Sequence, residues 1–194
     1  MKIKWIGKYN GTNLPIVPVD ASSNALPSVT TRHALALIPI LLLLGFCVYL
    51  KNGIIGERIV FTKGMLGIGF LIGIILFPVH EMLHAACFPA ESDVFLFFTK
   101  QGLGTTCTSP ISRNRFILIN LLPSVVLGLI PLLVYLVIPK GNANAATILF
   151  AVAFLQVGGS YADYINVFHL LRIPSKSIIQ ISGEKIFWKM KNDG

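Results

Sequence analysis

The chain carries little charge for its length. Of its 194 residues only 12% are Asp, Glu, Lys or Arg, about half the fraction that is typical of soluble domains, whereas 54% are hydrophobic. This shortage of charge excludes an ordinary soluble globular domain. It indicates a small polytopic membrane protein with one membrane domain.

Cysteine and acidic residues are also scarce. The chain has three cysteines, and two of them fall in apolar runs, which excludes a disulfide-stabilised fold. Eight acidic residues against 16 basic ones give a net charge of +8, which raises the question of nucleic acid. We exclude nucleic acid as a partner, because the basic residues lie in short connections between apolar runs and form no basic face with interleaved aromatics.

What the sequence does contain is a set of long apolar runs. A polar N-terminal segment, residues 1–33, precedes them, and a basic tail, residues 172–194, follows. A run of roughly 20 residues spans the hydrocarbon core of a bilayer. We therefore predict an all-α membrane protein whose membrane domain, residues 34–171, has about four transmembrane helices at 34–50, 64–88, 116–138 and 145–171.

The distribution of Lys and Arg predicts the orientation. With four spans, the N-terminus, the 90–115 loop and the C-terminus share one side of the membrane, and that side holds 12 of the 16 basic residues. Because basic residues are enriched in cytoplasmic loops, we predict a multi-pass protein of the cell membrane with both termini in the cytoplasm.

The 90–115 loop has its own structure in this prediction. Residues 94–99 are rich in strand-forming side chains, 100–104 contain two glycines typical of a turn, and 105–108 form a return strand. We predict a small β-hairpin on the cytoplasmic side. A second hairpin is predicted for residues 178–181 and 185–190, around Gly183.

The most specific motif is His80-Glu81-Met82-Leu83-His84, which reads H-E-x-x-H near the end of the second apolar run. On a helix, two imidazoles four residues apart project from nearly the same face and can bind one zinc ion. The glutamate between them can act as general base on a zinc-bound water. Three ionisable groups inside a membrane segment are costly unless they serve a site.

A catalytic zinc ion needs a third protein ligand, and the fourth run offers Asp163. Apart from Glu81, Asp163 is the only acidic residue in any apolar run. His80 and Asp163 each lie eight residues before the cytoplasmic end of their run, which places both about 12 Å below the boundary. Matching depth on separate helices predicts that His80, His84 and Asp163 share one metal ion.

Several neighbours admit more than one interpretation. Asn166, one turn after Asp163, could support a ligand or stabilise an oxyanion, or it could simply hydrogen-bond a neighbouring helix. Cys87 and His169 are alternative metal ligands, although an apolar filler and an interfacial histidine explain them without a metal. Gly158, Gly159 and Ser160 allow close helix approach and tolerate a local break.

These residues resemble those of the site-2-protease-like membrane metallopeptidases. The sequence is most similar to a family of small prokaryotic integral membrane proteins described as zincin peptidases, through His80–His84, the Phe/Thr-rich loop, Pro123 and Gly159–Asp163. The resemblance covers roughly residues 60–190 and implies a three-helix metalloprotease core with the first run as an accessory span. The wider family places its third ligand in a Leu-Asp-Gly motif, whereas Asp163 here lies between Ala and Tyr.

Taken together, the sequence predicts a Zn²⁺-dependent membrane peptidase, with Glu81 as general base and a membrane-protein or peptide substrate. The alternative is a zinc-binding membrane regulator or adaptor without proteolytic activity, which would need the ligands but not Glu81. A metal transporter would need several acidic or His residues along a path, whereas this chain has a single cluster. The substrate and the oligomeric state stay open at this point.

Overall fold

The computed structural model describes residues 2–28, 37–56, 61–99 and 102–191. These ranges leave out residues 1 and 29–33 of the predicted N-terminal segment, 34–36 of the predicted 34–50 run, 100 and 101 of the predicted turn, and 192–194 of the predicted tail. The described chain divides into two compact units. One comprises residues 30–80 and 123–162, and the other comprises residues 1–29, 81–122 and 163–194.

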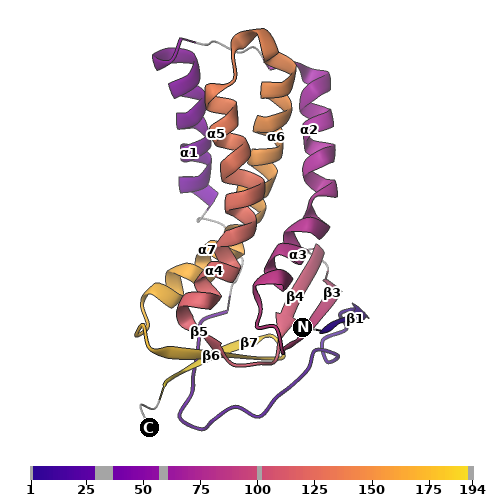
Figure 1. Ribbon diagram of the computed structural model, residues 1–194, viewed down its shortest axis with the longest axis vertical. Helices are drawn as coiled ribbons and strands as arrows, with labels where there is room; N and C mark the ends of the chain where they lie inside the picture. Colours follow the sequence, from indigo (N-terminus) through magenta and orange to yellow (C-terminus); the bar gives the residue numbers. More distant parts are fainter. Residues whose placement is uncertain (1, 29–36, 57–60, 100–101, 192–194) are drawn as a thin grey trace. The chain divides into compact units, whose positions relative to one another are not determined.

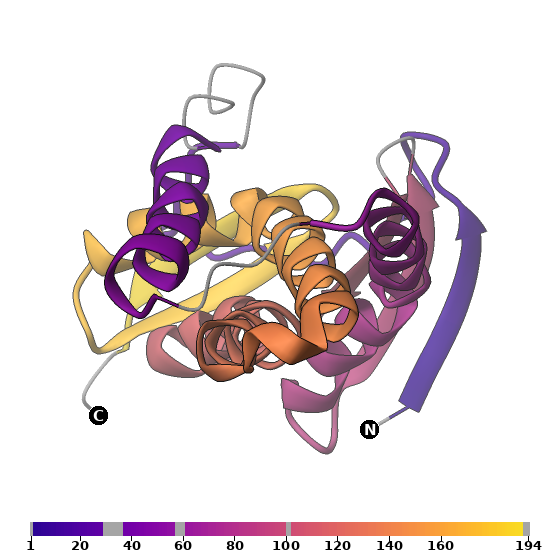
Figure 2. The ribbon, with the colours of Figure 1, turned by 90° about the horizontal axis from the view of Figure 1, so that it is seen from above.

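The first unit is a bundle of apolar helices (Figure 1). It contains α1 (Leu37–Tyr49), α2 (Lys63–Ile75), α5 (Ile130–Val137) and α6 (Ala143–Gly159), with π-helical turns η2 (Leu50–Ile54) and η3 (Val125–Leu129) and the short 3₁₀ turn η4 (Lys140–Asn142). Helix α6 packs against α1, α2 and α5, as the view from above shows (Figure 2). Four helical stretches are long and apolar enough to cross a membrane: Leu37–Ile54, Lys63–Cys87, Arg113–Val137 and Lys140–Gly159.

Glycines on α2 bring that helix close to α6. A Cβ atom at Gly69 would lie 2.7 Å from Ala151 Cβ, and one at Gly73 would lie 2.8 Å from a methyl group of Leu155. Both distances are shorter than real Cβ contacts, so the two helices approach through glycine backbone. A Cβ atom at Gly67 would instead meet nothing within 4 Å.

The other unit contains two sheets around a small core (Figure 1). A three-stranded sheet has the order β1 (Lys2–Lys8), β3 (Asp93–Thr99), β4 (Gly102–Cys107), and β1 runs parallel to β3. A four-stranded sheet has the order β2 (Asn24–Ala25), β7 (Lys185–Met190), β6 (Ser177–Ser182), β5 (Ile111–Ser112). The buried apolar side chains of this unit include Phe88, Val94, Phe116, Leu170 and Ile179.

Both predicted hairpins are present, as β3–β4 and β6–β7. The prediction of an otherwise all-α fold understates the β structure, because the N-terminal segment adds β1 to one sheet and β2 to the other. Strand β1 pairs with residues about 90 positions later in the chain. Periodicity within a short window carries no information on such a partner.

Three helices supply residues to this second unit: α3 (Phe77–Cys87), α4 (Arg113–Ser124) and α7 (Tyr161–Leu171). Two arginines that the charge count assigned to the cytoplasmic side bind helix ends here. Arg113 Nε donates to the carbonyl of Leu170 at 2.7 Å, and Arg115 donates to the carbonyls of Cys87 and Phe88 at 2.8 and 2.9 Å. Cations at helix C-termini satisfy the last carbonyl groups and oppose the helix dipole.

The fourth predicted span differs from the structure. A single helix over 145–171 was predicted, whereas α6 ends at Gly159 and α7 begins at Tyr161. Ser160 turns its hydroxyl back to the carbonyl of Gln156 at 2.8 Å, and a Cβ atom at Gly159 would lie 2.8 Å from the Phe77 ring. The break therefore follows from the small residues at 158–160, and it places Asp163 in the first turn of a new helix.

Candidate metal centre

Helix α3 carries the whole H-E-x-x-H motif. It begins at Phe77, two residues after α2 ends at Ile75, and runs without interruption to Cys87. The ligand atoms of His80, Glu81 and His84 all lie within 4.8 Å of one another along this helix. Such a group of one carboxylate and two imidazoles could hold a metal ion.

The imidazole of His84 is fixed at one nitrogen and faces a carboxylate with the other. Nδ1 lies 2.7 Å from the carbonyl oxygen of Ile119 on α4, and Nε2 lies 3.6 Å from Oδ2 of Asp163 on α7. Because a carbonyl group only accepts, Nδ1 carries the hydrogen and donates it. Nε2 of the neutral ring is then the atom with a lone pair, and it lies beside Asp163.

His80 is held in the same way by a side chain that the sequence analysis did not single out. Its Nδ1 lies 3.2 Å from Oε1 of Gln156, and the two residues are 4% and 0% exposed. The signal for Gln156 was present in the sequence as an uncharged polar residue in the middle of an apolar run. Only the packing of α6 against the end of α2 shows its partner.

The carboxylate of Glu81 is bound by the hairpin. Thr105 of β4 donates its hydroxyl to Oε2 of Glu81 at 2.7 Å and lies 3.2 Å from the Glu81 carbonyl oxygen. Thr105 was predicted as part of a return strand, but nothing in its local sequence indicates a contact with Glu81. The contact arises because the hairpin folds back on helix α3.

Asn166 lies on α7, one turn after Asp163, and its amide meets that of Asn120 on α4. Asn166 Nδ2 donates to Asn120 Oδ1 at 3.1 Å, and Asn120 Nδ2 donates to the carbonyl of Phe116 at 2.7 Å. Asn166 therefore makes the hydrogen bond between helices that we weighed as the alternative to a role in the site. It also faces the same cavity as Asp163, so the two interpretations are compatible.

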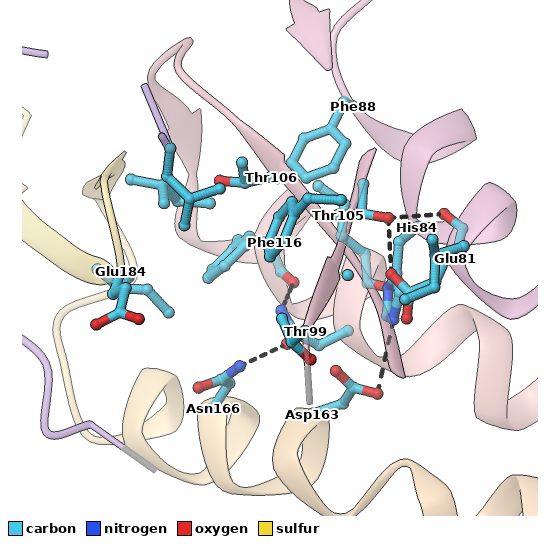
Figure 3. A pocket seen from close by; sticks show the side chains of 18 of the residues that line it. Glu81, His84, Phe88, Thr99, Thr105, Thr106, Phe116, Asp163, Asn166 and Glu184 are labelled. Atoms are coloured by element: carbon cyan, nitrogen blue, oxygen red, sulfur yellow. Dashed lines mark hydrogen bonds and ion pairs between the residues drawn. The ribbon is translucent and has the colours of Figure 1, made fainter. Parts of the chain in front are cut away.

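A cavity of about 340 Å³ lies within the second unit, and its polar lining includes Glu81, His84, Thr105, Asn120, Asp163 and Asn166 (Figure 3). Glu81, His84 and Asp163 lie close together in it, and Glu184 lies at a distance from them (Figure 3). The rest of the described lining is largely apolar and includes Leu14, Phe88, Phe97, Leu103, Phe116, Ile119, Ile181 and Ile186. Among the described residues that line this cavity, the predicted ligand His80 and the alternative ligands Cys87 and His169 are absent.

The N-terminal segment also contributes to the cavity, although the sequence assigned no chemistry to it. Tyr9 and Leu14 line the cavity, and the backbone nearby is tied to the β6–β7 turn. Gly183 N–H donates to the carbonyl of Pro15 at 3.0 Å, and Ser182 Oγ donates to the carbonyl of Val17 at 2.9 Å. The hydrogen bond from Tyr9 to the Glu184 carboxylate raises the pKa of the tyrosine.

The donor set fits a zinc ion. Zinc in catalytic sites takes nitrogen and oxygen ligands, and a ligating histidine almost always donates its other ring N–H to an oxygen acceptor. Both motif histidines have such an acceptor at Nδ1, from Gln156 and from Ile119. The anchored imidazoles, the carboxylate of Asp163 and a glutamate between the histidines are the features of a metallopeptidase of the zincin class.

Comparison with known families agrees with this class. Residues 73–178 match the model of a family described as "Putative zincin peptidase", and the matched region is more than half of the chain. The chain belongs to this family. Neither the curated proteins nor the solved structures contain a significant match.

Proposed function

We propose that this protein hydrolyses peptide bonds of membrane-associated substrates, with a zinc ion held by His80, His84 and Asp163. The observation that carries the proposal is the 3.6 Å separation between His84 Nε2 and Asp163 Oδ2. It brings the one additional carboxylate of the apolar runs to the motif from a separate helix. This pairing across helices is the reason we assign the protein to the site-2-protease-like metallopeptidases.

Glu81 is the proposed general base. A bound zinc ion would lower the pKa of a water molecule and polarise the carbonyl group of the substrate. Glu81 takes a proton from the water and later passes it to the leaving amine. The hydrogen bond from Thr105 orients the Glu81 carboxylate for both transfers. The proposed role of Asn166, which lines the same cavity, is to support the ligand Asp163 or to donate to the oxyanion.

Substrate binding is proposed along strand β4. In the described sheet β4 is the last strand after β1 and β3, and Thr105 on β4 contacts Glu81. An extended peptide that pairs with this edge would pass beside the general base. Because the peptide bonds of a helix are shielded, a transmembrane substrate must unwind before it can pair.

The membrane placement is part of the same proposal. Strand β1 pairs with β3, and β2 pairs with β7, so the N-terminal segment, the 90–115 loop and the C-terminal tail belong to shared sheets. Paired strands lie on the same side of a bilayer, so the chain crosses the membrane an even number of times between them. The four candidate spans fit this requirement. Together with the charge distribution, this supports a cell-membrane protein with both termini in the cytoplasm.

The test of the activity is Glu81→Gln, with zinc content measured on the purified protein in lipid and cleavage of a co-expressed membrane substrate measured in cells. We expect Glu81→Gln to keep its zinc and to lose cleavage, while Glu91→Gln, which changes an exposed glutamate, keeps both. Cleavage by Glu81→Gln at the wild-type rate contradicts the mechanism. A cellular phenotype that survives Glu81→Gln and is lost in His84→Ala identifies the non-proteolytic zinc-binding regulator instead.

A further inference from the structure

Gln156 is a fully buried amide in the middle of the helix bundle. It is 0% exposed on α6, within a segment whose other side chains are mainly apolar. A buried amide without partners costs several kcal/mol in an apolar environment, so its hydrogen bonds have to be accounted for. Both ends of this amide have a partner.

The partners determine which way the amide points. Gln156 Nε2 lies 2.7 Å from the carbonyl oxygen of Gly73, and Oε1 lies 3.2 Å from Nδ1 of His80. Because a carbonyl group cannot donate, only the NH₂ end of the amide can face Gly73. The oxygen end must then face His80. The orientation of this amide is thus fixed by chemistry.

The amide orientation in turn fixes the proton on His80. An amide oxygen only accepts, so Nδ1 of His80 carries the hydrogen and donates it to Gln156. In the neutral ring the lone pair is then at Nε2, the nitrogen available to a metal ion. If the amide were reversed, its N–H would donate to Nδ1, and the hydrogen on Nε2 would prevent ligation.

The contact depends on the close approach of α2 and α6. A Cβ atom at position 73 would lie 2.8 Å from a Leu155 methyl group and 3.2 Å from Leu155 Cβ, so glycine eases the close approach of the two helices. The carbonyl of Gly73 therefore lies within reach of the Gln156 amide. The orientation of His80 therefore depends on the packing of α2 against α6.

We propose that Gln156 is a positioning residue for the metal centre, which holds the Nε2 lone pair of His80 ready for zinc. This inference rests on the proposed function, because it takes His80 as a zinc ligand. It extends that function by assigning the choice of the ligating nitrogen to a residue on α6, outside the H-E-x-x-H motif. The backbone carbonyl of Ile119 accepts the corresponding hydrogen bond from Nδ1 of His84, and no side-chain substitution removes this carbonyl.

The experiment measures zinc affinity by chelator competition on the full-length protein in lipid, together with thermal stability. Gln156→Met keeps the size and shape of the side chain but removes both hydrogen bonds. We expect a loss of zinc affinity of about 10- to 100-fold, the usual effect of removing such a partner. Gln156→Glu, with its buried carboxyl group protonated, keeps a donor towards Gly73 and an oxygen acceptor towards His80, and is expected to stay within a few-fold of the wild type.

Thr147→Val is the matched control. Thr147 is also fully buried on α6, and its hydroxyl donates to the carbonyl of Ala143 at 2.7 Å without contacting a motif residue. This variant also loses a buried hydrogen bond of α6, but it should bind zinc as the wild type does. The absorption spectrum of the Co²⁺-loaded protein provides a second readout, which we expect to change in Gln156→Met and to be retained in Thr147→Val.

Three results would overturn the inference, and they can be told apart. If Gln156→Met binds zinc with the affinity of the wild type, Gln156 does not position His80, and the proposed function is unaffected. Equal losses of affinity in Gln156→Met and Thr147→Val, in step with thermal stability, assign Gln156 to packing alone. If the wild-type protein binds no zinc, both the proposed function and this inference are wrong.

Discussion

The hydroxyl of Thr105 donates a 2.7 Å hydrogen bond to the carboxylate of Glu81. This bond joins strand β4 to helix α3, so the proposed substrate-binding strand and the proposed general base are in direct contact. Thr105→Val removes the bond with little change in shape. Because a hydrogen bond to a charged group contributes about 1.5–3 kcal/mol, we expect kcat to fall roughly 10- to 100-fold.

The zinc affinity of Thr105→Val should stay at the wild-type value, since Thr105 contacts the base and not the proposed ligands. Thr105→Ser restores the hydroxyl and should restore most of the activity. Steady-state cleavage assays and chelator competition on the three proteins measure both quantities. Unchanged kcat in Thr105→Val would show that Glu81 is oriented without this bond.

Asp163→Ala tests the third ligand. If Asp163 binds zinc, the variant loses most of its metal at a zinc concentration that saturates the wild type. Asp93→Ala is the matched control, because it removes an exposed carboxylate that pairs with Lys4 and not with the motif. Metal analysis of the purified proteins decides the question, and equal zinc content in all three would remove Asp163 from the site.

Gly69→Ala tests the close packing of α2 and α6. Its new methyl group would lie 2.7 Å from Ala151 Cβ and 2.8 Å from the backbone oxygen of Ile148, so the helices must separate. Overpacking of this kind typically costs about 1–3 kcal/mol. Gly67→Ala places its methyl group in open space and should leave the unfolding free energy nearly unchanged. Unfolding of both variants in detergent or lipid measures the difference.

The pKa of Asp20 is expected to depend on Lys189. The hydrogen bond from Lys189 lowers the pKa of the Asp20 carboxyl group, and the backbone N–H of Ser22 lowers it further. A carboxyl group whose pKa is lowered by folding stabilises the folded state above its unfolded pKa of about 3.9. That contribution is lost as the pH falls from the unfolded pKa through the lower folded-state pKa. Lys189→Gln should raise the pKa of Asp20 in a carboxyl NMR titration. The pKa of Asp93, which Lys4 lowers, is the internal reference and should not move.

Cysteine labelling tests the membrane placement. In a background without native cysteines, we expect Thr12→Cys, Glu91→Cys and Glu184→Cys to react with an impermeant reagent from the same side of the membrane. All three positions are exposed and belong to the unit that contains the sheets. Gly141→Cys, between α5 and α6, should react only from the opposite side. Labelling of Thr12→Cys and Glu91→Cys from different sides would contradict the four-span arrangement.

Local signals were sufficient for most of the helical structure. The apolar runs gave the first three helical stretches because length and composition determine what can cross a bilayer. The two hairpins followed from strand-forming residues on either side of turn glycines. The parallel pairing of β1 with β3 could not be predicted, because no local pattern at Lys2–Lys8 identifies a partner near residue 93.

The candidate site also contains residues that local sequence signals identify and residues that only long-range packing reveals. The spacing of His80 and His84 follows from helix geometry, so the sequence could place them on one face of a helix. Asp163 lies beside His84, but the depth argument for it assumed one helix over 145–171, whereas α6 ends at Gly159 and α7 begins at Tyr161. Gln156 and Thr105 could not be placed, because their partners depend on how α6 and β4 pack against other elements. The residues that orient the proposed chemistry were therefore less predictable than the residues that perform it.

The pairing of β1 with β3 has a consequence for the biogenesis of the protein. Lys2 pairs with Asp93, which is made 91 residues later. At about 5–20 residues per second, β1 waits on the order of 5–20 s with an unpaired edge. Asp163 and the β6–β7 wall of the cavity are made later still. The nascent chain therefore cannot assemble this cavity, or act through it, until Ile186 has been made.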